Sequence, residues 1–141
     1  MKLYLAHHLK DRYKIKEWQD EVEDRFPIKF VNPFYDIHRE DIRQLDEKGV
    51  IGEENLSRTL DDCKFIVERD LEEIRKCDGV LAFVTKTIGT SMEIIMAYRI
   101  FKMPVYIISE KHSTHSWVRA NSTKQFKTKE EFLDAVYRKQ W

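Results

Sequence analysis

Residues 79–84 read Gly-Val-Leu-Ala-Phe-Val, an unbroken apolar run with polar segments on both sides. A strand of that composition is typical of the centre of a parallel sheet, where both faces are covered. A loop at residues 85–89 then leads into a helix predicted at about residues 90–101. This helix is apolar nearly all round, so we expect it to be buried.

The rest of the chain alternates between strand and helix patterns. Further strands are predicted at residues 2–6, 28–31 and 105–108, and helices at about 11–25, 56–76 and 129–138. Thr128 and Glu131 form a capping-box pattern for the last helix. We expect residues 38–54 to be partly helical and residues 109–124 to form a polar loop. Alternating strands and helices predict a single α/β domain over residues 1–141, with a doubly wound parallel sheet.

Composition narrows the class of partner. Lys plus Arg and Asp plus Glu both number 25, so the formal charge is zero, which disfavours a nucleic acid polymer and favours a nucleotide-sized ligand. No apolar stretch approaches the roughly 20 residues of a membrane helix, and the first residues lack a signal-peptide core. We therefore expect no membrane partner. Cys63 and Cys77 are expected to be reduced thiols of a cytoplasmic protein.

Two acids stand where a purely structural sequence would favour other residues. Glu93 lies at the predicted start of the apolar helix, directly after a central strand, and Asp70 falls on the inward stripe of residues 56–76. Burying a carboxylate costs several kcal/mol unless it is hydrogen-bonded or has a function that repays this cost. We expect the helix N-terminus to keep Glu93 ionised, as a nucleophile requires. Alternatively, Glu93 is one of the acids that are common in the first turns of helices. Asp70 would then lie on a solvent-exposed face of its helix.

Other candidate residues follow the strands, where ligands of such sheets bind. His7 follows the first strand, Phe34 and Asp36 lie in the loop after the second, and Gly89 with Thr90 can offer backbone N–H groups. Phe34 can stack on a base or belong to the core.

We expect no metal and no cofactor. His112 and His115 are more consistent with surface histidines than with a metal site, because no further ligand cluster accompanies them. The Gly-rich fingerprints of dinucleotide-binding and P-loop proteins are both missing from the sequence.

Three segments together resemble the nucleoside 2-deoxyribosyltransferase family, which includes deoxynucleoside 5′-monophosphate N-glycosidases. They are LYLA at residues 3–6, ERDLEEIRKCDGVLAFV at 68–84 and GTSMEIIMAYRIFKMPV at 89–105, and VNPFYD at 31–36 is also similar. The resemblance implies a flavodoxin-like sheet and a covalent glycosyl-enzyme intermediate on Glu93.

The resemblance also implies roles for other residues. Asp70 would assist protonation of the leaving base, Tyr4 would hydrogen-bond Glu93, and Asn121 would reach the sugar across the interface of a homodimer or larger homo-oligomer. The sequence departs from the family twice. Thr87 stands where transferases often carry a base-reading acid, six residues before the nucleophile, and residues 7–12 lack the Gly/Ser/Arg-rich phosphate loop of the monophosphate hydrolases.

The function expected from the resemblance is cleavage of the N-glycosidic bond of 2′-deoxynucleosides, with transfer of the deoxyribosyl group to another base or to water. Three alternatives stay open. They are a strict deoxynucleoside 5′-monophosphate N-glycosidase, a non-catalytic nucleotide-binding or sensing module, and an NAD-cleaving glycohydrolase.

Overall fold

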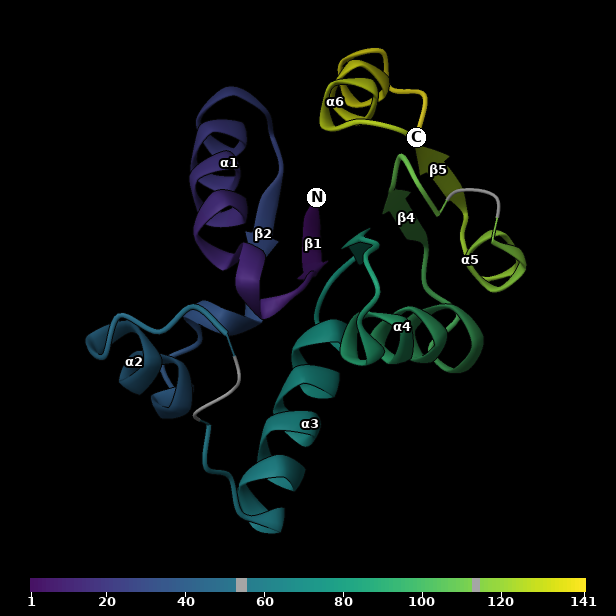
Figure 1. The fold of residues 1–141 in the computed structure, drawn as a ribbon. Helices are drawn as coiled ribbons and strands as arrows, with labels where there is room; N and C mark the ends of the chain where they lie inside the picture. The colour runs from purple at the N-terminus through teal and green to yellow at the C-terminus, as the bar shows by residue number, and fades with distance from the viewer. Residues whose placement is uncertain (53–55, 113–114) are drawn as a thin grey trace.

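A computed structural model describes residues 1–52, 56–112 and 115–141, which form one parallel sheet covered by helices on both faces (Figure 1). Strands follow the order β2-β1-β3-β4-β5 and are all parallel. This is the doubly wound order of flavodoxin-like sheets, whose switch point lies between β1 and β3. The predicted fold class is confirmed.

The strands are β1 (Lys2–Ala6), β2 (Lys29–Val31), β3 (Gly79–Phe83), β4 (Val105–Ile108) and β5 (Lys124–Phe126). The α-helices are α1 (Arg12–Arg25), α2 (Glu40–Glu47), α3 (Leu60–Arg75), α4 (Ile88–Ile95), α5 (Ser116–Ala120) and α6 (Lys129–Tyr137). Short 3-10 turns occupy Leu9–Asp11 and Pro33–Tyr35, and a π-helical turn, Met96–Ile100, extends α4.

Alternation along the strands divides the core between two helix layers. Leu3 and Leu5 of β1 face the cluster that contains Trp18 of α1 and Phe132 of α6. Side chains of successive strand residues point to opposite faces, so Tyr4 lies on the other side. There it joins the cluster formed by α3 and α4. Tyr4 is thereby placed beneath the two helices that carry the candidate acids.

The polar segment after β2 is held against α1 by one buried cation. Arg12 has no exposed surface, and its guanidinium donates to the Asp46 carboxylate at 2.7 Å. It also donates to the carbonyl oxygens of Leu9, Val50 and Ile51. A buried arginine requires such partners. The predicted partly helical segment is α2, and residues 53 and 54 of that prediction lie outside the described residues.

Two short elements contradict the predicted polar loop at residues 109–124. This stretch contains α5 and the first residue of β5. Five residues are too few to show a helical period, and β5 is an edge strand of three residues in which only Phe126 is buried. Neither element carries the apolar run that marks β3.

The expected burial of two helices is also wrong. Met92 of α4 is 63% exposed and Ile100 of the π-turn is 60% exposed. Helix α3 begins at Leu60 rather than near residue 56, because Thr59 and Asp62 form a reciprocal capping box. Its first half extends beyond the sheet (Figure 1), so Cys63 and Val67 of the predicted inward stripe are exposed. Only its last turns reach the core.

Both cysteines are free thiols, Cys63 exposed and Cys77 buried. Among the described residues, no helix combines the length and the hydropathy that a membrane crossing demands.

Gly79 begins β3 where the backbone of Pro104 approaches closely. A Cβ at this position would lie 2.8 Å from the Pro104 carbonyl oxygen. We expect Gly79→Ala to lower the free energy of unfolding by ~1–3 kcal/mol, because the backbone of two central strands must separate. Urea unfolding measures the change.

Gly89→Ala is the matched control, since a Cβ there meets nothing within 4 Å. In a helical position this change should be neutral or slightly stabilising. Equal stabilities of the two variants would contradict the close approach at Gly79.

Candidate active site

A cavity of about 430 Å³ lies at the carboxyl ends of β1, β2 and β3. This volume falls within the usual range of small-ligand sites. Its walls come from the loops after these strands, from α3 and from the start of α4. The lining residues are His7, His8, Leu9, Phe34, Arg39, Arg58, Ile66, Val67, Asp70, Lys86, Thr87, Ile88, Gly89, Thr90 and Glu93.

Glu93 is held by the first strand. The Tyr4 hydroxyl donates to Glu93 Oε1 at 2.7 Å, although 89 residues separate the two along the chain. Tyr4 has no exposed surface, and burial together with the nearby Glu93 and Asp70 carboxyls raises its pKa well above the ordinary value. The phenol therefore keeps its proton and acts as a donor. One oxygen of Glu93 is oriented while the side chain lines the cavity.

The protonation of Glu93 differs from the expectation. Burial raises the pKa of Glu93 from 4.5 to about 8, and the negative charge of Asp70 adds to the rise. The Tyr4 hydrogen bond and the charge of Arg39 oppose it. Helix α4 starts at Ile88, so Glu93 lies in its second turn, past the free N–H groups. Helix α4 therefore gives Glu93 little of the expected N-terminal stabilisation, and burial favours the protonated form of its carboxyl.

Asp70 is the second acid of the cavity. Burial raises its pKa from 3.8 to about 6, with Asp36 and Asp41 adding to the rise and Arg39 opposing it. The two acids therefore titrate at about 6 and about 8, and between these values they carry one proton between them. A cavity that holds one carboxyl proton next to a second carboxyl can supply both an acid and a base.

Two hydroxyl groups in the cavity wall lack partners. The Oγ1 atoms of Thr87 and Thr90 are buried, and neither has a hydrogen-bond partner among the described residues. Gly89 lies between them in the first turn of α4, where backbone N–H groups are also free. Because buried polar atoms are nearly always bonded, these oxygens favour a polar ligand at this wall.

His7 and Phe34 pack together at the opposite wall. Their rings meet edge to face with centroids 4.9 Å apart. Burial lowers the pKa of His7, and its ring nitrogens contact Asn32 Oδ1 and the His8 carbonyl oxygen, each at 3.1 Å. Phe34 is part of the small cluster around Leu9 and also lines the cavity. Phe34 therefore packs in the core and also borders the cavity, and base stacking stays a prediction.

Tyr4 contacts Glu93 from outside the cavity lining, and two further expected site residues, Asp36 and Asn121, also lie outside it. Asp36 accepts a hydrogen bond from Arg69 Nε at 3.1 Å and acts only as a nearby charge on Asp70. Asn121 is 2% exposed, and its amide is bonded within the chain, to Arg99 Nε at 2.5 Å and to the Trp117 carbonyl oxygen at 2.7 Å. Within this chain it does not reach Glu93.

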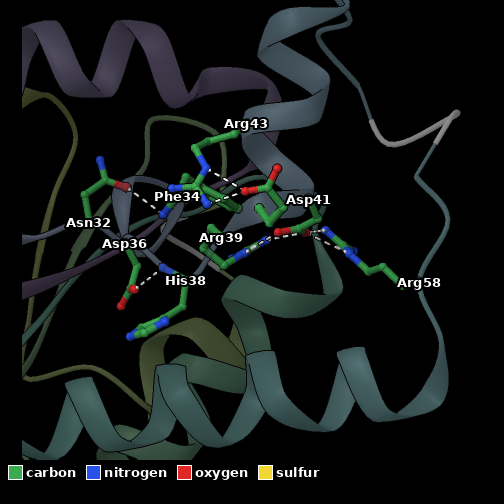
Figure 2. A network of polar contacts seen from close by, with 9 residues as sticks. Asn32, Phe34, Asp36, His38, Arg39, Asp41, Arg43 and Arg58 are labelled. Atoms are coloured by element: carbon green, nitrogen blue, oxygen red, sulfur yellow. Dashed lines mark hydrogen bonds and ion pairs between the residues drawn. The ribbon is translucent and has the colours of Figure 1, made fainter.

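The cavity contains cations that sequence reasoning missed. Arg39 and Arg58 both donate to the Asp41 carboxylate, at distances between 2.7 and 3.1 Å, and Figure 2 shows this carboxylate between the two guanidinium groups. Lys86 follows β3. Arg39 and Arg58 come from the polar segment after β2, where no periodicity distinguishes one arginine from another. Within the described ranges, no cluster of His, Cys, Asp and Glu fits a metal ion.

The fold and the paired acids define a flavodoxin-like α/β protein with its candidate site at the β1/β3 switch point. No family model matches the chain, and no curated protein sequence matches it. Among solved structures, the chain is similar to the 2-deoxyribosyltransferase of the psychrotolerant bacterium Bacillus psychrosaccharolyticus. The TM-score is 0.61 over 99% of this chain and 90% of that one, at 16% identity. At this identity the likeness establishes the fold.

Burial of the Glu93 carboxyl has a consequence for stability. In the unfolded chain this acid loses its proton near pH 4.5, whereas in the folded chain it keeps it to about pH 8. Rising pH therefore favours the unfolded state over that range, by at most ~1.4 kcal/mol per pH unit. We expect Glu93→Gln to gain stability relative to the unmodified chain as pH rises from 5 to 8. Urea unfolding across this range measures the difference.

Glu68→Gln, on the exposed side of α3, is the control and should leave the pH dependence unchanged. Parallel stability curves for Glu93→Gln and the unmodified chain would show that Glu93 ionises normally in the folded state.

Proposed function

We propose that the protein cleaves the N-glycosidic bond of a 2′-deoxynucleoside or its nucleotide and transfers the deoxyribosyl group to another base or to water. The observation that carries this proposal is the placement of Glu93, oriented by Tyr4 at 2.7 Å, in the same cavity as Asp70. The resemblance of three sequence segments and the structural likeness to a 2-deoxyribosyltransferase support it.

In the proposed reaction, a carboxylate oxygen of Glu93 attacks C1′ of the deoxyribose. The bond between C1′ and the base nitrogen breaks, its electron pair leaves with the base, and Asp70 supplies a proton to that base. An acceptor base or water then attacks C1′ and gives its proton to Asp70, while the bond between C1′ and Glu93 breaks and restores the Glu93 carboxylate. This is the two-step course of retaining glycosidases. Tyr4 holds the oxygen of Glu93 that it touches, so the other oxygen is the candidate nucleophile.

The reactive arrangement has Glu93 ionised and Asp70 protonated. Burial raises the pKa of Glu93 to about 8 and that of Asp70 to about 6, so in the free protein it favours the proton on Glu93. Positive charge that develops at C1′ in the transition state favours the ionised form of Glu93. The proposed reaction therefore requires that Glu93 lose its proton and that Asp70 be protonated before the base leaves.

The remaining cavity residues are proposed to position the substrate. Thr87, Gly89 and Thr90 offer two unpartnered hydroxyl groups and free backbone N–H groups for sugar or base oxygens. Phe34 presents an aromatic surface beside His7 for a base. Thr87 takes the place of the base-reading acid of many transferases, which points to a different base preference.

Assembly into a homo-oligomer in the cytoplasm is part of the proposal. Val67, Ile88 and Met92 are large apolar side chains that are more than half exposed around the cavity and α4, as expected of a surface covered by a second copy. Asn121 could serve a neighbouring site only if its bond to Arg99 opens on assembly.

Glu93→Gln tests the nucleophile, because the amide keeps the size of the side chain and cannot attack C1′. We expect base release from deoxynucleosides and their 5′-monophosphates to fall by about 10³-fold or more. The assay resolves free base, free sugar and exchanged nucleoside by chromatography, with and without an acceptor base. Glu68→Gln serves again as the control and should retain full activity.

The same assay separates the rival functions. Undiminished release by Glu93→Gln would exclude the mechanism. Nucleotide binding without turnover in the unmodified protein would favour the sensing module, and release of nicotinamide from NAD would favour the glycohydrolase.

The paired acids predict a bell-shaped pH profile. The form that carries one proton on the pair prevails between about pH 6 and about pH 8, so kcat/KM should rise through the lower value and fall through the upper one. Asp70→Asn removes one of the two titrations. Its profile should therefore keep a single ionisation, that of Glu93, at a lower pKa than in the pair because the repulsion is gone. A flat profile for the unmodified protein between pH 5 and 9 would contradict this pairing.

A further inference from the structure

The arginines of the cavity carry a buried excess of positive charge. Arg39 is 4% exposed, its guanidinium is bonded to Asp41, and the same carboxylate also serves Arg58. Burial raises the pKa of Asp41, but the bonds from both arginines outweigh it and leave the pKa below the ordinary value. Two cations on one anion leave one positive charge without a partner. An arginine cannot shed that charge by losing its proton.

Asp70 makes no direct bond to these arginines. Among the described residues no hydrogen bond or ion pair joins it to Arg39 or Arg58, although the charges of both act to lower its pKa, which burial raises to about 6. Lys86 lines the same cavity and adds a further cation. A neutral ligand such as a base carbonyl would accept a hydrogen bond here, yet it would leave the excess charge in place. An anion would remove it.

The guanidinium groups are also oriented in advance. Each uses its Nε and Nη2 atoms on Asp41, so the Nη1 end of each has no partner among the described residues. The Arg39 guanidinium lies 5.3 Å from the centre of the Phe34 ring, which fixes its plane. Figure 2 shows both side chains converging on Asp41 of α2, Arg39 from the residue before that helix and Arg58 from the segment before α3. The two Nη1 ends therefore remain to donate hydrogen bonds to an anionic group such as a phosphate.

Arg12, which follows β1, is not available to bind an anionic ligand in the cavity. Arg12 is fully buried and bonded to Asp46 and to backbone oxygens, on the side away from the lining of the cavity. The arginines available to a ligand are therefore Arg39 and Arg58, with Lys86 beside them in the lining.

We propose that Arg39 and Arg58, clamped by Asp41, form a subsite for a phosphate monoester, so that the ligand of this cavity is a nucleotide rather than a nucleoside. This inference rests on the proposed function for the placement of the sugar at Glu93. The phosphate occupies the arginine end of the cavity, and the glycosidic bond faces the two acids.

Binding tests this subsite independently of catalysis. Calorimetric titrations compare each deoxynucleoside with its 5′-monophosphate in the Glu93→Gln protein, which does not consume them. We expect the monophosphates to bind at least about 10-fold more tightly. Arg58→Gln, added to that protein, should weaken monophosphate binding by roughly 10- to 100-fold and change deoxynucleoside binding by less than about twofold. Arg58 is chosen because its side chain is more exposed than that of Arg39, at 23% against 5%.

Arg43→Gln is the matched control, since Arg43 also belongs to this polar segment but pairs with Glu40 outside the cavity lining. It should leave both affinities unchanged. Inorganic phosphate, titrated as a competitor, should displace the monophosphates and leave the deoxynucleosides bound. This arm separates free phosphate as a ligand from the phosphate of a nucleotide.

Equal affinities for deoxynucleosides and monophosphates would overturn the proposal. So would an equal loss of both ligands in Arg58→Gln, because the arginine would then read the base or support the fold. If monophosphates bind through Arg58 but the unmodified protein releases no base, the subsite stands and the proposed function fails. If the protein cleaves deoxynucleosides and prefers them to monophosphates, the function stands and the subsite fails.

Discussion

The hydrogen bond between Tyr4 and Glu93 joins the centre of the sheet to the helix that covers it, and the candidate site depends on it. Tyr4 pairs with Val80 across β1 and β3, so its hydroxyl is placed by the most buried part of the fold. The partner is a partly buried acid that lines the cavity, and burial makes its charged form costly. A proton on Glu93 relieves that cost. Structure and chemistry therefore conflict at this residue, because the nucleophile needs the charge that burial opposes.

The strands were predictable where both faces of the sheet are covered, and helix burial was not. β1, β3 and β4 are continuous apolar runs because each contacts both helix layers, and such a run has few other readings. Periodicity shows which residues share a face of a helix, but it does not show whether another element covers that face. The apolar residues of α3 and α4 that were expected inside, such as Val67 and Met92, are exposed for this reason. β5 has too few buried residues to leave a pattern.

The candidate acids could be inferred from sequence. An acid on an otherwise apolar helix face is unusual, and the sequence of that helix alone is enough to recognise it. The arginines could not be inferred in this way. Arg39 and Arg58 lie in a polar segment where charged residues are unremarkable, and they become notable only when tertiary contacts bring both onto Asp41. Asp36 shows the opposite case: its position after β2 suggested a ligand contact, but its side chain pairs with Arg69. Proximity in sequence to a strand end does not determine where a side chain points.

The cavity thus contains a pair of acids and a pair of arginines, and the charges of the two pairs are balanced in different ways. Asp70 and Glu93 can take up protons, and burial favours this by raising their pKa values to about 6 and about 8. Arg39 and Arg58 cannot lose theirs, so Asp41 or a bound anion must balance them. A ligand with one charged and one uncharged end fits this asymmetry in a single orientation. Its anionic group balances the charge of the arginines. Its uncharged glycosidic bond lies against the two acids, whose burial costs less free energy when the pair carries a proton.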